Sequence, residues 1–244
     1  MDPLTAIAAS GLRARMESLD LLANNVANAS TGGYKADREF YSLYLAPEAA
    51  DSDDPRQMPL IDRPWIDLAQ GAIHSTGNPT DVAISGKGFF AVDGPAGPLY
   101  TRNGSFQLSA AGRLITSEGY PVRNTGGGAL DLQSSLPFEI SKDGTVIQGG
   151  NRIGQIEIAD FASTTGLAKR GANYFHNTDL ATKPAAASGA SVEQGKLESS
   201  NTGSAESAVR LVSVMRQFEM LQRAVTLGAE MNRRAVEEVA KVGS

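Results

Sequence analysis

The stretch "ANNVANASTGGYKA", residues 23–36, lies where a helical pattern stops and an extended pattern begins. Before it, apolar residues recur with the 4-3-4-3 spacing that is typical of one face of a helix. This stripe consists of Leu12, Met16, Leu19, Ala23 and Val26. Because Asp2 and Pro3 are favourable starting residues, the sequence predicts a helix over residues 1–31.

Three asparagines and two glycines follow on the last turns of this helix. They are Asn24, Asn25, Asn28, Gly32 and Gly33. The asparagine amides can bond backbone carbonyls or a neighbouring chain, and the glycines permit backbone conformations that a Cβ would disfavour. We therefore expect a turn at the glycine pair and an extended segment over residues 32–75. Tyr34 would either anchor that segment or be the buried tyrosine of an ordinary helix end.

A second amphipathic pattern occupies the far end of the sequence. Its apolar stripe is Leu211, Met215, Phe218, Val225, Ala229 and Val236. Arginines and glutamates interleave with the stripe, as on the solvated face of a helix. Ser204 is a favourable N-cap and Glu206 suits the first turn, so the sequence predicts a second long helix over residues 204–244.

Between the two helices the hydrophobic pattern changes to period 2. Short runs such as "DVAIS", "GFFAV" and "FEISKDGTVI" are separated by Asp-Gly, Asn-Gly and Gly-rich turns. This pattern predicts an all-β domain over residues 76–190 and a return segment over 191–203. Residues 46–64 have the Pro/Asp composition of a linker or covering loop. The predicted fold class is α+β, in which long N- and C-terminal helices pair as a coiled coil and an all-β domain is inserted in the middle.

Neither helix can bury its apolar stripe alone. Burial of each Leu, Met or Phe side chain contributes about 1.5–3 kcal/mol, so both stripes favour a partner. One interpretation is an intramolecular two-helix hairpin, and the other is packing against copies or relatives of the chain in a larger assembly. For the second interpretation the candidate interface residues are Leu12, Met16, Leu19, Asn24, Asn25, Val26, Asn28, Tyr34, Leu211, Met215, Phe218 and Val225.

Composition excludes several classes of function. The chain has 244 residues, a formal net charge of -5 and no cysteine, so it has neither a basic run for nucleic acid nor any thiol chemistry. No stretch of about 18 apolar residues occurs, and we expect no direct membrane insertion. The opening residues carry no positive n-region and no small-residue cleavage site, so we expect no cleaved signal peptide.

The candidate chemical motifs favour no cofactor, no metal and no catalytic residue. Gly86 and Gly88 match part of a dinucleotide fingerprint, but "FFAVDGP" after them reads as a strand, and we expect a tight structural turn. His74 and His176 have no second ligand at a suitable spacing. The acidic run at residues 51–54 lacks the pattern of a calcium loop and is interpreted as a solvated linker. The sequence predicts a protein that is not an enzyme.

Four ordered motifs resemble the flagellar rod and hook protein family. They are "NNVANASTGGYKA" (24–36), "NPTDVAISGKGFFAV" (78–92), "YTRNGSFQLSAAGRLITSEGYPV" (100–122) and "QGKLESSN" (194–201). The length and the helix "MRQFEMLQRAV" (215–225) are most like the proximal-rod type, and next the distal-rod type. After Asn201 the family often continues with a β-branched residue and a second Asn, whereas this chain has Thr202-Gly203.

The resemblance implies a structural subunit of the basal-body rod that transmits torque. Its partners would be other rod proteins, copies of itself and the flagellar type III export apparatus, and it would reach the periplasm without a cleaved signal. The turn after the first helix would lead from the inner layer of the rod to the next layer outward. Two alternatives stay open, namely a secreted or phage-tail-like binding module with helical oligomerisation ends, and an enzyme of unrecognised type.

Overall fold

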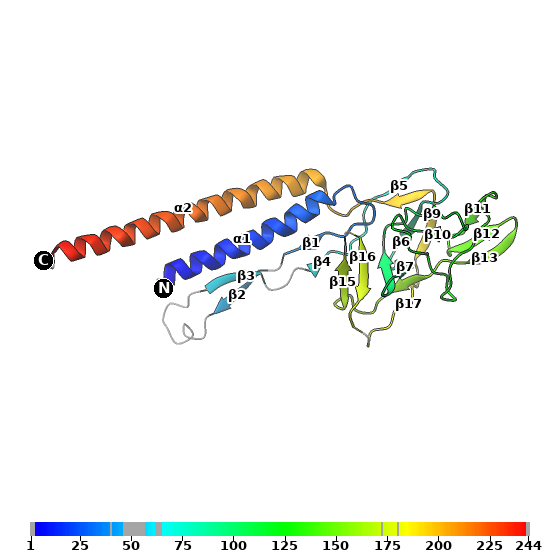
Figure 1. The fold of residues 1–244 in the computed structure, drawn as a ribbon, viewed down its shortest axis with the longest axis horizontal. Helices are drawn as coiled ribbons and strands as arrows, with labels where there is room; N and C mark the ends of the chain where they lie inside the picture. The colour runs from blue at the N-terminus through cyan, green and yellow to red at the C-terminus, as the bar shows by residue number, and fades with distance from the viewer. Residues whose placement is uncertain are drawn as a thin grey trace. The chain divides into compact units, whose positions relative to one another are not determined.

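The computed structural model describes residues 3–39, 41–45, 57–61, 65–171, 173–179 and 181–242. An N-terminal helix, a mostly-β middle and a C-terminal helix follow one another along the chain, which confirms the predicted α+β class (Figure 1). The chain divides into two compact units. The first unit comprises residues 1–27, 36–67 and 202–244, and the second comprises 28–35 and 68–201.

In the first unit, helix α1 (Pro3–Ala27) packs against helix α2 (Ser204–Val242). The two helices run antiparallel, and Gly11 lies opposite Leu221, whose Cδ1 is 3.9 Å from the Cβ position of the glycine (Figure 1). At 1.5 Å per residue the helices are about 37 and 58 Å long, so α2 continues beyond the start of α1. The predicted helix over 1–31 is too long at its end, because residues 28–31 form a turn in which the Thr31 N–H donates to the Asn28 carbonyl (3.0 Å).

Short strands complete the first unit. β1 (Asp37–Arg38) pairs with β4 (Trp65–Ile66), and β2 (Tyr41–Leu45) pairs with β3 (Gln57–Ile61), both antiparallel. Strand β3 lies beside α1. Part of the predicted linker over 46–64 is therefore a strand, in which Gln57–Ile61 pairs with Tyr41–Leu45. The predicted acidic linker at 51–54 falls outside the described residues.

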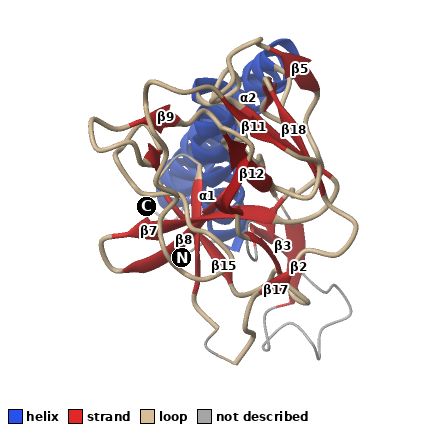
Figure 2. Ribbon diagram, turned by 90° about the vertical axis from the view of Figure 1, so that its right-hand side faces the viewer, coloured by secondary structure: helices blue, strands red, loops and turns tan. Residues whose placement is uncertain are grey.

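The second unit is built from antiparallel strands (Figure 2). Its largest sheet has the order β15-β16-β8-β7-β14-β17. The strands of this sheet are β7 (Phe89–Gly94), β8 (Gly97–Thr101), β14 (Ile158–Asp160), β15 (Leu167–Arg170), β16 (Tyr174–Asn177) and β17 (Ala185–Ala186). The smaller sheets contain β5 (Ile73–Ser75), β6 (Val82–Ser85), β9 (Gln107–Leu108), β10 (Leu114–Ile115), β11 (Phe138–Ile140), β12 (Thr145–Gln148), β13 (Asn151–Gln155), β18 (Ser191–Gln194) and β19 (Lys196–Glu198).

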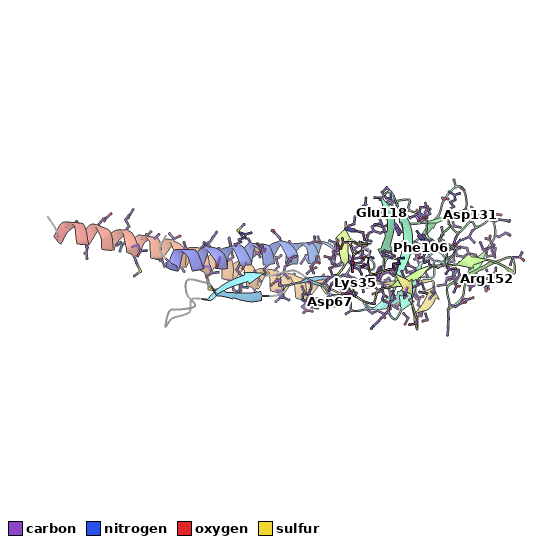
Figure 3. The ribbon with its side chains drawn as sticks, turned by 90° about the horizontal axis from the view of Figure 1, so that it is seen from below. Lys35, Asp67, Phe106, Glu118, Asp131 and Arg152 are labelled. Atoms are coloured by element: carbon purple, nitrogen blue, oxygen red, sulfur yellow. The ribbon has the colours of Figure 1, made fainter. Side chains whose placement is uncertain are left out.

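The core of the second unit combines aliphatic residues with several buried aromatic rings. Phe90 and Phe106 meet edge to face with ring centroids 5.1 Å apart, and both side chains are buried. Figure 3 labels Phe106 among the side chains of this unit. Buried aliphatic residues from β6, β10, β12 and β18 pack around this pair. They include Val82, Ile84, Leu114, Val146 and Val192. The period-2 pattern of the middle of the chain therefore places alternate side chains in this core.

Candidate assembly interface

Helix α1 buries a face that is largely small and polar. From residue 9 onward, where the burial of its side chains is described, the buried residues are Ala14, Ser18, Leu22 and Asn25. Of the predicted stripe, Leu12, Leu19 and Val26 are half-buried, whereas Met16 is 54% exposed and Ala23 is exposed. The apolar stripe therefore lies to one side of the packed face, because small residues rather than large ones allow the close helix contact at Gly11.

The buried and half-buried residues of helix α2 are more regularly spaced than those of α1. Ser207 and Val214 on it are buried, and Leu211, Phe218, Leu221 and Val225 are half-buried, with a 4-3-4-3-4 spacing. Three of the predicted interface residues, Leu211, Phe218 and Val225, therefore face the α1 side within the unit. Met215, which the sequence analysis placed on the same stripe, is 47% exposed and lies outside this face.

A second apolar face of α2 is exposed. Its large residues are Val209, Val212, Met220, Leu227 and Met231, which are 48–72% exposed. At about 100° per residue these five positions fall within one strip on the side of the helix opposite Val214 and Phe218. Val209, Val212 and Met220 also line a groove of about 640 Å³. This strip was not predicted from the sequence, although its residues are 3, 8, 7 and 4 positions apart and therefore fall on one helical face.

Asn25 holds the chain that follows α1. Its Nδ2 donates to the Asp37 carbonyl (2.8 Å), and its Oδ1 accepts from the Asp37 N–H (3.0 Å), so the amide pairs with the backbone as a neighbouring strand would. Ser18 Oγ donates to Glu39 Oε1 (2.6 Å), and Arg210 lies 3.7 Å from Glu39 Oε2. Asn25 therefore secures β1 within the unit, whereas Asn24 is exposed and Asn28 is half-buried.

Tyr34 is buried in the second unit. Its side chain has no exposed area, and Lys169 Nζ lies 4.4 Å from the centroid of its ring. The Asn201 N–H donates to the Tyr34 carbonyl (3.3 Å). The tyrosine thus anchors residues 28–35 to the β structure, and its buried ring offers no surface for a contact with another subunit.

The most unusual feature of the second unit is a buried ionic cluster, which comprises Lys35, Arg102 and Glu198. Lys35 Nζ donates to Glu198 Oε1 (2.6 Å), and Arg102 Nη1 donates to Glu198 Oε2 (3.2 Å). The side chains of Lys35 and Glu198 are 0% exposed, and that of Arg102 is 5% exposed. Because Glu198 faces two cations, its carboxylate compensates charge on both sides of the cluster.

Backbone groups complete this ionic cluster. Lys35 Nζ also donates to the Ala69 carbonyl (2.7 Å), and the Gly71 N–H donates to Glu198 Oε1 (2.8 Å). Arg102 Nη2 donates to the Gly86 carbonyl (2.6 Å). Burial lowers the pKa of Arg102, and the carboxylate of Glu198 opposes that shift. The cluster was not predicted from the sequence, because Lys35 and Glu198 are 163 positions apart.

The predicted turns lie next to this cluster. Gly33 has φ +66°, and its N–H donates to the Glu198 carbonyl (2.8 Å), while Gly32 lies beside Asn103. Gly86 and Gly88 join β6 to β7 with φ of +104° and +122°. A dinucleotide fingerprint requires a helix after its glycines, and the residues after Gly88 form strand β7 instead.

The two histidines are not grouped with other ligands. His74 Nδ1 lies 3.1 Å from Ser199 Oγ, and His176 lines a pocket on another sheet. Among the residues that the structure describes, no cluster of three His, Cys, Asp or Glu side chains could hold a metal ion. Within the same part of the chain, no helix is long and apolar enough to cross a membrane.

Three protein-family models match successive parts of the chain. The model described as flagella basal body rod protein matches residues 6–35, the flagellar hook protein FlgE/F/G D1 domain matches 83–171, and the C-terminal model of flagellar basal body rod FlgEFG proteins matches 193–238. The flagellar basal-body rod protein FlgF of Caulobacter vibrioides is 34% identical over 227 residues, which are 92% of each chain. The chain belongs to the flagellar basal-body rod protein family.

Other members of the rod family are nearly as similar. The rod protein FlgG of Agrobacterium fabrum is 32% identical over 249 residues, covering 93% of this chain and 95% of the relative. FlgG of Buchnera aphidicola subsp. Acyrthosiphon pisum is 30% identical over 259 residues, covering 95% and 97%. The resemblance that the four sequence motifs indicated is therefore confirmed. The rod and C-terminal family matches include most of α1 and α2, and the D1 match lies in the β unit.

Proposed function

We propose that this chain is a structural subunit of the flagellar basal-body rod and assembles through its terminal helices with copies of itself and other axial proteins. The exposed apolar strip of α2 carries this proposal. A monomer has no use for five large apolar side chains on the face opposite its packed one, because each would be stabilised by about 1.5–3 kcal/mol on burial. A neighbouring helix laid on this face would bury the strip, in the manner of a coiled-coil seam.

Family membership supports the finer parts of the proposal. The subunit would be exported without a cleaved signal by the flagellar type III apparatus and would act in the periplasmic part of the rod, where it transmits torque. We infer that the subunit is of the proximal-rod type, in line with the 34% identity to a FlgF protein. In this proposal α1 and α2 form the inner layer of the assembled rod, and the β unit belongs to its outer layer. We propose no catalytic role.

The assembly proposal predicts a loss of function without a loss of folding. Val212→Asp and Met220→Asp should each abolish swimming in a strain that carries the variant as its sole copy, because a carboxylate buried in a helix contact without a partner costs several kcal/mol. Both side chains are exposed in the single subunit, so its free energy of unfolding should change by less than about 0.5 kcal/mol. Motility assays and urea unfolding of the purified subunit measure the two effects.

Gln222→Asp is the matched control for this experiment. Gln222 is an exposed polar residue of α2 outside the apolar strip, so the same charge placed there should leave swimming intact. Phe218→Asp provides the opposite comparison, because it acts on the face turned toward α1 and should lower subunit stability as well. Normal swimming of both the Val212 and the Met220 variants would refute assembly through this face.

A further inference from the structure

The largest sheet contains a fork between two neighbouring strands. β16 pairs with β8 at Tyr174↔Thr101 and Phe175↔Tyr100. If the pairing of β16 with β8 continued in register, His176 would face Leu99 and Asn177 would face Pro98. The ladder of the described strands ends before these positions. Pro98 has no N–H to donate, which disfavours further pairing at this end of β8.

Both walls of the fork are nevertheless held in place. β16 stays paired with β15 as far as Leu167↔Asn177, and β8 stays paired with β7 as far as Gly94↔Gly97. The space between them is a pocket of about 740 Å³, which is within the range of about 300–1,000 Å³ that is usual for binding pockets. The fork is therefore a preformed opening at which two strand edges face each other without pairing.

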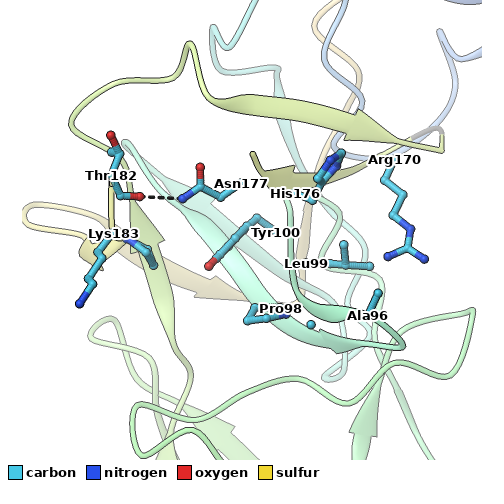
Figure 4. A pocket seen from close by; sticks show the side chains of 11 residues that line it. Ala96, Pro98, Leu99, Tyr100, Arg170, His176, Asn177, Thr182 and Lys183 are labelled. Atoms are coloured by element: carbon cyan, nitrogen blue, oxygen red, sulfur yellow. Dashed lines mark hydrogen bonds between the residues drawn. The ribbon is translucent and has the colours of Figure 1, made fainter. Parts of the chain in front are cut away.

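The lining of the pocket is apolar at its floor and basic at its ends. Figure 4 shows Arg170 and Lys183 on opposite sides of Pro98, Leu99 and Tyr100. Both cationic side chains belong to exposed residues, and the residues that line the pocket include no Asp or Glu. The Nδ1 atom of His176, another lining residue, is buried and has no hydrogen-bond partner among the described atoms.

The loop that carries Lys183 is ordered by its own hydrogen bonds. Asn177 Nδ2 donates to the Thr182 carbonyl (2.6 Å), as Figure 4 shows. Asp179 accepts from the Ala181 N–H (2.9 Å) and from Thr182 Oγ1 (2.6 Å), and these bonds lower the pKa of Asp179. The carboxylate of Asp179 is thus engaged within the loop, and no hydrogen bond or ion pair joins the Lys183 side chain to another residue of the described part of the chain.

We propose that this fork binds an extended, carboxylate-bearing segment of a partner protein. An extended segment fits because the strand edges of the fork offer backbone groups, and an apolar floor receives alternate side chains. An acidic segment fits because the rim is cationic in a chain whose net charge is -5. Two cations at opposite ends of an apolar floor suit two carboxylates on one segment better than one compact anion. This docking surface lies outside the terminal helices and is independent of the rod assembly proposed above.

Isothermal titration calorimetry of the full chain with acetyl-(Glu-Thr)₄-amide tests this proposal. The peptide presents carboxylates on one face of a strand, and acetyl-(Gln-Thr)₄-amide is its uncharged counterpart. We expect saturable binding of the glutamate peptide, at least about tenfold weaker binding of the glutamine peptide, and weaker binding at high salt. Arg170→Met and Lys183→Met should each weaken binding by about fivefold, whereas Lys142→Met, outside the pocket, should not.

The thermal midpoint of each variant separates a loss of binding from a loss of folding. Lys183 lies in an exposed loop, so its variant should keep the midpoint of the unaltered chain. Absence of binding by the glutamate peptide, equal binding of both peptides, or unchanged affinity of the Lys183 variant would overturn the proposal. Displacement of the peptide by inorganic phosphate at equal concentration would also overturn it, because it would indicate a simple anion site.

Discussion

Replacing Glu198 with glutamine should lower the free energy of unfolding of the β unit by about 3–5 kcal/mol. Removal of one partner from a buried ionic cluster leaves the remaining charges in a medium of low polarity without compensation. In this cluster the change would remove the carboxylate charge that Lys35 and Arg102 share, and their side chains are only 0% and 5% exposed. Urea unfolding followed by tyrosine fluorescence, together with hydrogen exchange of β6 and β8, measures the loss.

Two further variants calibrate this result. Asp131→Asn breaks the exposed pair with Arg113 (3.0 Å) and should cost less than about 1 kcal/mol. Lys35→Met should cost less than Glu198→Gln, because the carboxylate keeps Arg102 and the Gly71 N–H as partners. If Glu198→Gln were no more destabilising than Asp131→Asn, the buried cluster would not stabilise the β unit.

Replacing Gly33 with alanine should also destabilise the β unit, by at least about 3 kcal/mol. A Cβ at this position would lie 2.3 Å from the backbone carbon of Arg102 and 2.3 Å from the Asn103 nitrogen, so one segment must move. The positive φ of +66° adds a backbone strain of about 1–2 kcal/mol for any residue with a Cβ. The same unfolding experiment reports this effect.

Gly77→Ala is the matched control for Gly33→Ala. Gly77 has a similar φ of +73°, but a Cβ there would meet no heavy atom within 4 Å. We therefore expect Gly77→Ala to show the backbone strain alone, and the difference between the two variants to report the close approach to residues 102–103. Equal losses in the two variants would contradict that close approach.

The sequence predicts the elements of this fold well and their packed faces less well. The 4-3 spacing and the change to period 2 predicted two terminal helices and a β middle, because one buried face imposes these periods on the chain. The packed face of α1 was missed, since Ala14, Ser18 and Asn25 carry no apolar signal. Which apolar face of α2 is packed and which is exposed depends on the position of α1. The local sequence of α2 does not contain this information.

The buried ionic cluster could not be predicted from the sequence, for a different reason. Lysine, arginine and glutamate are rarely buried, so their presence in alternating segments indicates solvated positions. Only the meeting of residues 33–35, 69–71, 102 and 198 creates the site in which these charges compensate one another. Likewise, the fork between β8 and β16 follows from strand register, which is fixed by contacts distant in sequence.

The cluster joins the segments through which the chain enters and leaves the β unit. The polypeptide crosses between the two units four times, near residues 27, 35, 67 and 201. Lys35 bonds Ala69, Glu198 bonds Gly71 and Gly33, and Asn201 bonds Tyr34 and Ala69, so the β-unit ends of all these crossings are fastened to one another. A force that pulls on one of the four connecting segments is consequently resisted by the others as well, because their β-unit ends are hydrogen-bonded to one another. Pulling one segment away requires several hydrogen bonds to break together.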